Sequence, residues 1–300
     1  MKTVRKAILF LFLLAPGFLI GQILDKEQLI KDITYLSSPK LGGRATLSAG
    51  NRLAQTYIAE RFHDLELTSQ FQDFIQYFTM KGGRRTQDQQ NPANIIGFIP
   101  GTETDTLILV MAHYDHLGSK GKDVFLGADD NASGTAALLA FAAHFSVHRP
   151  KHSFLFAALD AEELGLLGSK ALLADFPFPL DLIKVVVNMD MIGRSETNRL
   201  YAVGSRHYPQ LKRYLLPIKE NTSIDLYLGN DGGTGEKDWS NASDHGPFHA
   251  KGIPFIYFGV DDHEDYHKPT DSVDRIDLDF YTNATELILQ VLLQIERDIL

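Results

Sequence analysis

Apolar segments that alternate with helical segments constrain the fold of this chain more than any other feature of its sequence. Runs such as Val185-Val186-Val187 are apolar at consecutive positions, as in strands whose two sheet faces are both covered. The predicted strands are Asn94–Ile99, Leu107–Ala112, Ser153–Leu159, Lys184–Met189, Tyr201–Val203, Ile224–Leu228 and Pro254–Phe258. Helices are predicted from Thr135 and over Leu164–Leu173, Pro209–Leu216 and Asp279–Ile299. This alternation predicts a doubly wound α/β domain.

Two amphipathic helices are predicted ahead of this region, over Lys26–Leu36 and Ser48–Leu65. Phe71–Met80 alternates enough for a strand, and the polar segment Lys81–Pro92 is expected to be a loop or hairpin. The N-terminal residues have a sequence pattern unlike that of the rest of the chain. Basic residues precede an apolar run over Ala7–Ile20, which predicts a signal peptide over residues 1–21 and export to a periplasm or the extracellular space. A membrane anchor is the alternative, but the run is shorter than the roughly 20 residues that a span needs.

Composition narrows the choice of partners and compartment. The formal net charge of −9 gives nucleic acid no general electrostatic attraction, so no nucleic-acid partner is expected. After removal of the signal, no stable association with a membrane is expected either. The chain has no Cys, so it must rely on its core instead of disulfides. Its 300 residues and 44% hydrophobic content are ample for such a core.

Ionisable residues follow the ends of several predicted strands although they lie far apart in the sequence. They are His113, Glu162, Glu163, Asp190 and, after a short acidic loop, His267. Ligand sites in open α/β sheets lie beyond the carboxyl ends of the strands, so these side chains are expected to converge. So many carboxylates would repel one another and raise their pKa values. Bound divalent cations would remove that repulsion.

Two further adjacent carboxylates, Asp129 and Asp130, precede the apolar helix that begins near Thr135. Acidic residues at this place have a simple structural explanation, because they complement the helix macrodipole. Asn131 or Ser133 can cap the same helix. Taken together with the cluster at the strand ends, however, the two carboxylates favour metal binding.

The residue types indicate which metal and which chemistry. Histidine and carboxylate ligands without Cys suit zinc, with manganese or cobalt as possible substitutes. Two ions about 3.5–4 Å apart would need a shared carboxylate. Asp115, two residues after His113 on a strand, points the same way and can hydrogen-bond its imidazole. Neighbouring side chains diverge in Glu162–Glu163, so one can bind metal while the other acts as general base.

Five segments together resemble the co-catalytic zinc aminopeptidases of peptidase family M28. They are His113-Tyr-Asp115-His, Gly127-Ala-Asp-Asp130-Asn-Ala-Ser-Gly, Asp160-Ala-Glu162-Glu163-Leu-Gly-Leu-Leu-Gly-Ser, Asn188-Met-Asp190-Met-Ile-Gly and Tyr266-His267. The resemblance implies two zinc ions, one held by His113, Asp130 and Asp190 and the other by Asp130, Glu163 and His267. Asp130 would bridge them.

The same resemblance implies roles for other residues. Glu162 would be the general base that activates a metal-bound water. Tyr266 is similar to a family tyrosine that stabilises the oxyanion, and the peptide between Asp129 and Asp130 is expected to be cis. The reaction implied is removal of N-terminal residues from peptides that have a free N-terminus.

The fold implied is a three-layer α/β/α domain with a mixed, mostly parallel central sheet. The roughly 50 residues between Phe62 and His113 leave no room for a protease-associated insert. Residues 22–300 are therefore expected to form one catalytic domain.

Three other functions stay open at this point. Glutaminyl cyclases, which are acyltransferases with one zinc, share the fold and several motifs. Carboxypeptidase-type specificity is a second alternative, since Arg194 can meet a carboxylate. A binding module that has lost its metals is the third, although no ligand is missing from the set. Asp244, His245 and Trp239 are further candidates near the pocket, as are His116 and His263.

Overall fold

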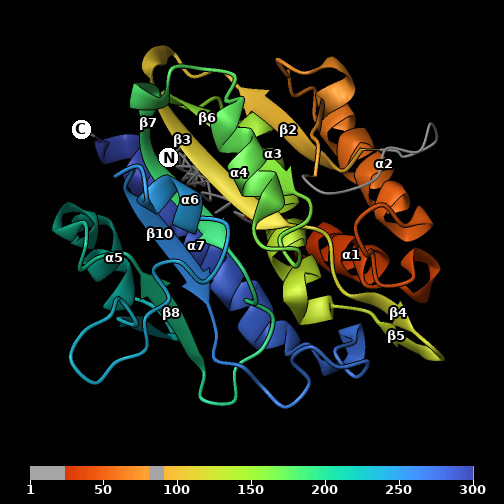
Figure 1. The fold of residues 1–300 in the computed structure, drawn as a ribbon. Coiled ribbons are helices and arrows are strands. Elements are labelled where there is room, and N and C mark those ends of the chain that lie inside the picture. The colour runs from red at the N-terminus through yellow and green to blue at the C-terminus, as the bar shows by residue number, and fades with distance from the viewer. Residues whose placement is uncertain (1–23, 81–90, 300) are drawn as a thin grey trace, which may run out of the picture.

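A mixed sheet of eight strands forms the centre of the computed structural model, which describes residues 24–80 and 91–299 (Figure 1). Its strands are β1 (Ile75–Tyr77), β2 (Ala93–Ile99), β3 (Glu103–His113), β6 (His152–Leu159), β7 (Ile183–Met189), β8 (Arg199–Val203), β9 (Asp225–Leu228) and β10 (Phe255–Gly259). The order across the sheet is β1-β2-β6-β3-β7-β10-β8-β9. A separate hairpin consists of β4 (Gly118–Lys120) and β5 (Asp123–Phe125).

The middle of the sheet is parallel. β3 pairs in parallel with both β6 and β7, and β7 pairs in parallel with β10. The carboxyl ends of these four strands therefore meet at one edge. Antiparallel pairings of β1 with β2, β2 with β6 and β8 with β10 make the sheet mixed. The predicted mixed, mostly parallel sheet is confirmed.

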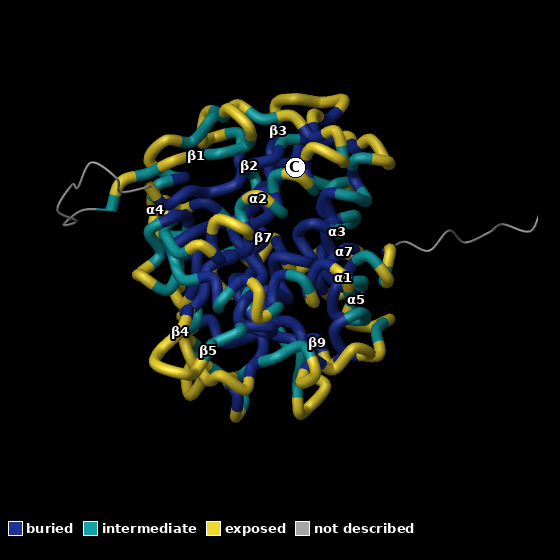
Figure 2. The backbone as a smooth tube through the Cα atoms, turned by 90° about the vertical axis from the view of Figure 1, so that its right-hand side faces the viewer, coloured by how far each residue is buried: buried dark blue, intermediate teal, exposed yellow. Residues whose placement is uncertain are grey.

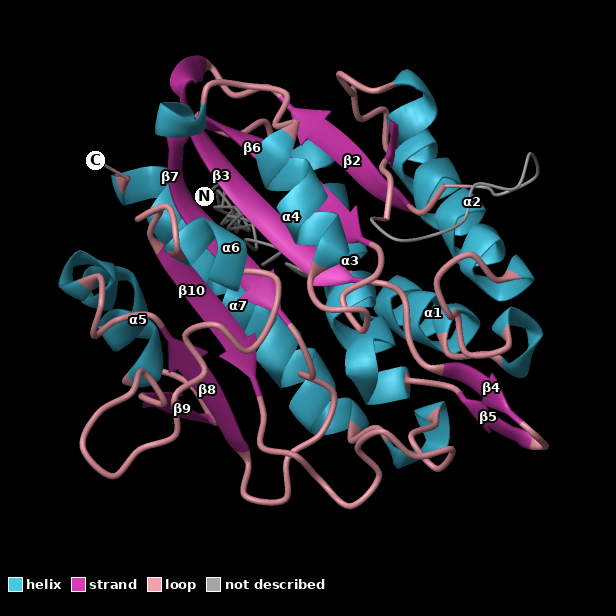
Figure 3. Cartoon of the chain, viewed as in Figure 1, coloured by secondary structure: helices cyan, strands magenta, loops and turns pink. Residues whose placement is uncertain are grey.

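Helices cover both faces of the sheet, as Figure 3 shows. They are α1 (Lys26–Leu36), α2 (Ala49–Asp64), α3 (Gly134–Val147), α4 (Leu167–Ala174), α5 (Lys212–Lys219), α6 (Gly246–His249) and α7 (Leu278–Asp298). Strand β3 explains the layering because its side chains alternate between the two faces. Ile108 and Val110 join the core under α1, α2, α3 and α7, while Leu109 and Met111 join the core under α4 and α6.

Burial follows this layering. The tube in Figure 2 is buried through the sheet and its covering helices, and the exposed segments lie around the outside. β6 is buried at all eight of its positions, which accounts for the continuous apolar run in its sequence. Side-chain oxygens cap α1 and α2 at their starts: Asp25 accepts from Gln28 N at 3.0 Å, and Ser48 accepts from Asn51 N at 3.0 Å.

Two elements are shorter than the sequence predicts. The strand expected over Phe71–Met80 is reduced to β1, because Asp73 and Phe74 have φ values of 51° and 67°, which an extended strand does not allow. The helix expected from Leu164 begins at Leu167, since Leu166 lies in the left-handed region at φ 60°.

Two further expectations concern residues outside the described part of the chain. The predicted signal peptide over residues 1–21 lies there, as does most of the loop predicted over Lys81–Pro92. Within residues 24–80 and 91–299, no helix combines the length and the apolar character that crossing a membrane requires.

Candidate active site

Four of the predicted site residues lie just beyond strands of the parallel part of the sheet. His113 ends β3, Glu162 and Glu163 follow β6, and Asp190 follows β7. His267 comes from the loop after β10. Because these strands are parallel neighbours, they deliver the side chains to the same edge, and residues spread over 155 positions of the chain meet there.

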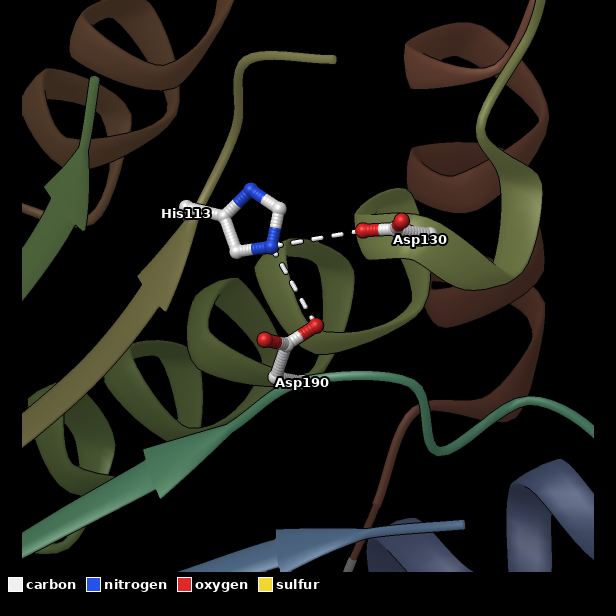
Figure 4. Close-up of side chains that lie close together, drawn as sticks. All are labelled: His113, Asp130 and Asp190. Atoms are coloured by element: carbon white, nitrogen blue, oxygen red, sulfur yellow. Dashed lines mark hydrogen bonds and ion pairs between the residues drawn. The ribbon is translucent and has the colours of Figure 1, made fainter. Parts of the chain in front are cut away.

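The first group of possible metal ligands is His113, Asp130 and Asp190 (Figure 4). His113 Nε2 lies 3.2 Å from Asp190 Oδ1 and 3.4 Å from Asp130 Oδ1. The opposite ring nitrogen, Nδ1, lies 3.2 Å from the Asp115 carbonyl oxygen and 3.6 Å from its carboxylate. An Nδ1–H directed at Asp115 leaves the lone pair of Nε2 facing the two carboxylates, which is the arrangement of a ligating imidazole.

The second group contains the other oxygen of Asp130. Asp130 Oδ2 lies 3.1 Å from His267 Nε2, which in turn lies 3.5 Å from Glu163 Oε2. The two oxygens of one buried carboxylate thus face two different imidazoles, His113 on one side and His267 on the other. A bridging carboxylate between two ions has this orientation.

The separations between ligand atoms fit zinc. With zinc–ligand bonds of about 2.0–2.1 Å, the ligand atoms of a tetrahedral site lie roughly 3.3–3.4 Å apart. The four distances from His113 and His267 to the carboxylates range from 3.1 to 3.5 Å. In each group the imidazole nitrogen therefore lies at a distance from its two carboxylates that suits ligands of one zinc ion.

Asp115 holds the two neighbouring glutamates as well as His113. Its carboxylate is fully buried and accepts from Glu162 N at 3.1 Å and from Glu163 N at 3.4 Å. The two glutamate side chains have different surroundings. Glu163 lies between His116 and His267, with Oε1 2.8 Å from His116 Nδ1 and Oε2 3.5 Å from His267 Nε2, whereas the charges that act on Glu162 come chiefly from His113 and Asp190. Their divergence agrees with two different roles.

Burial raises the pKa of Glu162 to about 10, an effect that the Asp190, Asp244 and Asp115 charges reinforce and His113 opposes. Burial also raises the pKa of Asp244 to about 7. A confined carboxylate with a raised pKa is a stronger proton acceptor than an exposed one. The same concentration of negative charge is what bound cations would relieve.

The loop that carries Asp130 is held by Asp271, a residue that the sequence analysis did not single out. Its carboxylate accepts from Asp129 N at 2.9 Å and from Asp130 N at 3.1 Å. The expected cis peptide between Asp129 and Asp130 is wrong by one residue, since the cis bond joins Asp130 to Asn131. Asp271 instead accepts from the amide of the predicted bond, Asp130 N, and from the amide before it, Asp129 N. Asn131 does cap the following helix, accepting from Gly134 N at 2.9 Å.

Arg44 is a second residue that sequence reasoning missed. Its guanidinium is completely buried and donates to four carbonyl oxygens: Leu36 at 2.5 Å, Leu126 at 2.6 Å, Tyr114 at 2.7 Å and Gly127 at 2.9 Å. Burial lowers its pKa to about 10, so it stays charged at neutral pH. It joins the end of α1 to the loops on either side of the β4–β5 hairpin.

Two other residues predicted near the site, Tyr266 and His245, lie in different surroundings. Tyr266 lines the pocket and stacks on the His267 ring with centroids 3.9 Å apart. His245 is a core residue, stacked between Phe255 and Tyr257, and its Nε2 lies 2.9 Å from the Trp239 carbonyl oxygen. Burial lowers the pKa of His245 to about 3, so this ring is neutral.

Arg194 and His263 are both engaged by acidic partners. Arg194 forms an ion pair with Asp265, so its charge already has a partner in the protein. His263 Nε2 lies 2.9 Å from Asp129 Oδ2, and this contact helps to raise the pKa of His263. Both residues therefore brace the loops around the site.

A pocket of about 370 Å³ opens beside the metal-ligand groups. Its lining includes the carboxylates of Asp130, Glu162, Glu163 and Asp190. The lining also includes the apolar and aromatic side chains of Leu166, Met191, Trp239, Tyr257 and Val260. Tyr257, which sequence reasoning missed, donates to the Asp190 carbonyl at 3.3 Å. A pocket of this kind suits a ligand that has a positive group next to an apolar one.

Sheet and site together define an α/β protein with groups of candidate metal ligands at the carboxyl edge of its parallel strands. The chain belongs to peptidase family M28, whose model matches residues 94–292. Aminopeptidase YwaD of Bacillus subtilis is 30% identical over 213 residues, which are 66% of this chain and 44% of the relative. Leupeptin-inactivating enzyme 1 of Streptomyces exfoliatus is 27% identical over 77% of this chain and 48% of its own length. Against three fungal relatives, two named probable zinc metalloproteases and one a probable leucine aminopeptidase, the chain spans 48%, 39% and 61% of their length.

Solved structures share the fold. LapB from Legionella pneumophila superposes with a TM-score of 0.72 at 19% identity, over 92% of this chain and 73% of its own. The zinc aminopeptidase BSAP from Bacillus subtilis gives 0.70 at 19% identity, over 89% and 94%. Glutaminyl cyclase from Bacteroides thetaiotaomicron also gives 0.70, at 18% identity over 89% and 97%. The fold is thus common to proteins with different reactions, and function must be argued from the site.

Proposed function

We propose that this chain is an exported aminopeptidase that uses two zinc ions to hydrolyse the N-terminal peptide bond of its substrates. One observation supports this proposal above the others. The two carboxylate oxygens of Asp130 face two separate groups of ligand atoms, with His113 3.4 Å from Oδ1 and His267 3.1 Å from Oδ2. His113, Asp130 and Asp190 would hold one ion, and Asp130, Glu163 and His267 the other.

Bound at these positions, the ions would polarise the scissile carbonyl and acidify a water molecule. The residues of the chain do the rest. Glu162, confined beside the ligands, takes the proton from the attacking water and passes it to the leaving amine. Tyr266 lies against His267 at the same pocket and is placed to donate to the developing oxyanion.

The pocket supports recognition of a free N-terminus. An α-ammonium group would be attracted by the carboxylates that line the pocket, and an apolar side chain could contact Met191, Trp239 and Tyr257 in the same lining. We therefore propose a preference for peptides that begin with a bulky apolar residue. In a carboxypeptidase, Arg194 would bind the substrate carboxylate. In this structure Arg194 is already paired with Asp265.

Metal titration together with a substrate panel tests the proposal. Chelation should abolish hydrolysis of leucyl-p-nitroanilide, and two equivalents of zinc should restore it, while N-acetylated leucyl-p-nitroanilide should resist cleavage. A glutaminyl cyclase would instead saturate with one equivalent and convert glutaminyl substrates to pyroglutamyl products. Active protein that holds no divalent metal would contradict the whole proposal.

A further inference from the structure

We propose that His116 is a positioning residue, which donates its Nδ1–H to Glu163 Oε1 and so reserves Glu163 Oε2 for the second ion. The inference rests on the proposed function, because it concerns how one ligand of that site is held. His116 Nδ1 lies 2.8 Å from Glu163 Oε1, the length of a strong hydrogen bond to a carboxylate. The other oxygen, Oε2, is the one that lies 3.5 Å from His267 Nε2.

The distances to Asp130 alone would also allow His116 to be a ligand. His116, Asp130 and Glu163 each offer an atom to a group compact enough to hold an ion, and His116 Nδ1 lies 3.7 Å from Asp130 Oδ2. The two roles require different tautomers. As a donor, His116 carries its proton on Nδ1; as a ligand, it must leave Nδ1 bare and carry the proton on Nε2.

The surroundings of Nε2 decide between these tautomers. The ring is 1% exposed, and no residue in the described part of the chain provides a hydrogen-bond partner for Nε2. A proton there would be a buried donor without a protein acceptor, which is unfavourable. His113 has the opposite arrangement, because its outer nitrogen faces the Asp115 carbonyl oxygen at 3.2 Å. Ligating imidazoles almost always have such an acceptor. His113 therefore has the surroundings of a ligand, and His116 those of a donor.

The ring of His116 is fixed in place by its neighbours. Gly127, at φ +59°, lies so close that a Cβ there would be 2.6 Å from the ring atoms Cγ and Cδ2. The Gly127 carbonyl accepts from Arg44 Nη2 at 2.9 Å, and the His116 amide donates to the Arg44 carbonyl at 3.4 Å. Glu163 is thus held by a buried ring that is itself held on both sides. His267, the other imidazole near Glu163, is 39% exposed and has no comparable enclosure.

Replacement of His116 by two residues separates the roles. The side-chain amide of Asn places an N–H close to the position of imidazole Nδ1, whereas Ala has no donor. We expect His116→Ala to weaken binding of the second zinc ion by roughly 10–100-fold and His116→Asn to stay within about threefold of wild type. The first ion should bind equally well in all three proteins. His152→Asn is the matched control, because His152 is also buried, 3% exposed, but lies at the opposite end of β6.

Zinc content by mass spectrometry and competition with a chromophoric chelator give the two affinities without an activity assay. Thermal unfolding of the metal-free proteins reports whether each variant folds. If His116→Asn loses the second ion as fully as His116→Ala, the ring is a ligand and the inference is wrong. It is equally wrong if both variants bind like wild type. Should His116→Ala fail to fold, His116→Asn alone decides: retention of the second ion supports the role, and a tenfold loss overturns it. Wild-type protein that binds only one ion would contradict the proposed function instead.

Discussion

Exchange of each of the two neighbouring glutamates for glutamine separates metal binding from proton transfer. Glu162 is largely buried, and the charges around it are those of His113, Asp190, Asp244 and Asp115. Glu162→Gln keeps the shape of the side chain and removes the base. A positioned general base typically contributes on the order of 10²–10⁴-fold, or about 3–5 kcal/mol of transition-state stabilisation. We expect the loss to appear in kcat with KM nearly constant and with both zinc ions retained.

Glu163→Gln is the matched comparison, since it makes the same chemical change one residue away. Glu163 Oε2 lies 3.5 Å from His267 Nε2, among the ligand atoms of the second group. An amide oxygen is a poorer ligand than a carboxylate. The affinity for the second ion should therefore fall by more than the roughly 10–100-fold that removal of a ligand's hydrogen-bond partner causes. Metal-free Glu162→Gln should unfold no more easily than wild type, because burial already opposes the charged carboxylate.

Three measurements on the same samples show which glutamate binds metal and which transfers the proton. They are kinetics with leucyl-p-nitroanilide, zinc content and thermal unfolding. If Glu162→Gln loses a metal ion while Glu163→Gln keeps both and is only slower, the two roles are reversed. If neither change lowers turnover, a carboxylate base is not part of the mechanism.

Three further predictions concern the scaffold and the chain start. Asp271→Asn leaves one oxygen for two backbone amides, so it should lower the free energy of unfolding by about 1–3 kcal/mol in urea titrations. The matched change at the exposed Asp274, Asp274→Asn, should alter that free energy little. Equal stabilities of the two variants would show that the Asp271 carboxylate does not hold the loop. Burial lowers the pKa of His245 from 6.5 to about 3, and the unfolded chain therefore binds a proton that the folded protein refuses. Between pH 7 and pH 5 the free energy of unfolding of wild type should fall by about 2 kcal/mol more than that of His245→Asn. If the two proteins lose stability equally over this pH range, protonation of His245 in the unfolded chain is not the cause. Mature protein should begin near Gln22 when its N-terminus is sequenced from the exported fraction, and an intact Met1 on cytosolic protein would contradict export.

Much of the fold was predictable because both sheet faces are covered. Continuous apolar runs identified β3, β6, β7 and β10, and the ionisable residues after them were expected at one edge. The structure does place His113, Glu163, Asp190 and His267 together around Asp130. That expectation required only the direction of the strands, which the alternation of strands and helices indicates.

The residues that hold these ligands were not predictable in the same way. Arg44 follows two glycines and looks like an exposed turn residue, yet the fold surrounds it with carbonyl oxygens from segments up to 83 positions away. Asp271 lies in an acidic, polar stretch with no apolar pattern of its own. His116 is of a residue type that often binds metal, and its role depends on which atoms surround its Nε2. Such contacts depend on loop paths, and hydrophobic periodicity does not specify loop paths.

The buried guanidinium of Arg44 has a consequence for the smallest chain that can work. The family match spans residues 94–292 and contains every proposed ligand, the base and the pocket. A chain trimmed to that span would lack both α1 and Arg44, whose side chain joins Tyr114, Leu126 and Gly127 to the end of α1. The carbonyl oxygens of Tyr114, Leu126 and Gly127 would lose their shared donor, and the loop that positions Asp130 would lose an anchor on each side of the hairpin. The segment that carries the proposed ligands and the pocket is therefore smaller than the segment that holds them in place, because the latter includes Arg44 and the end of α1.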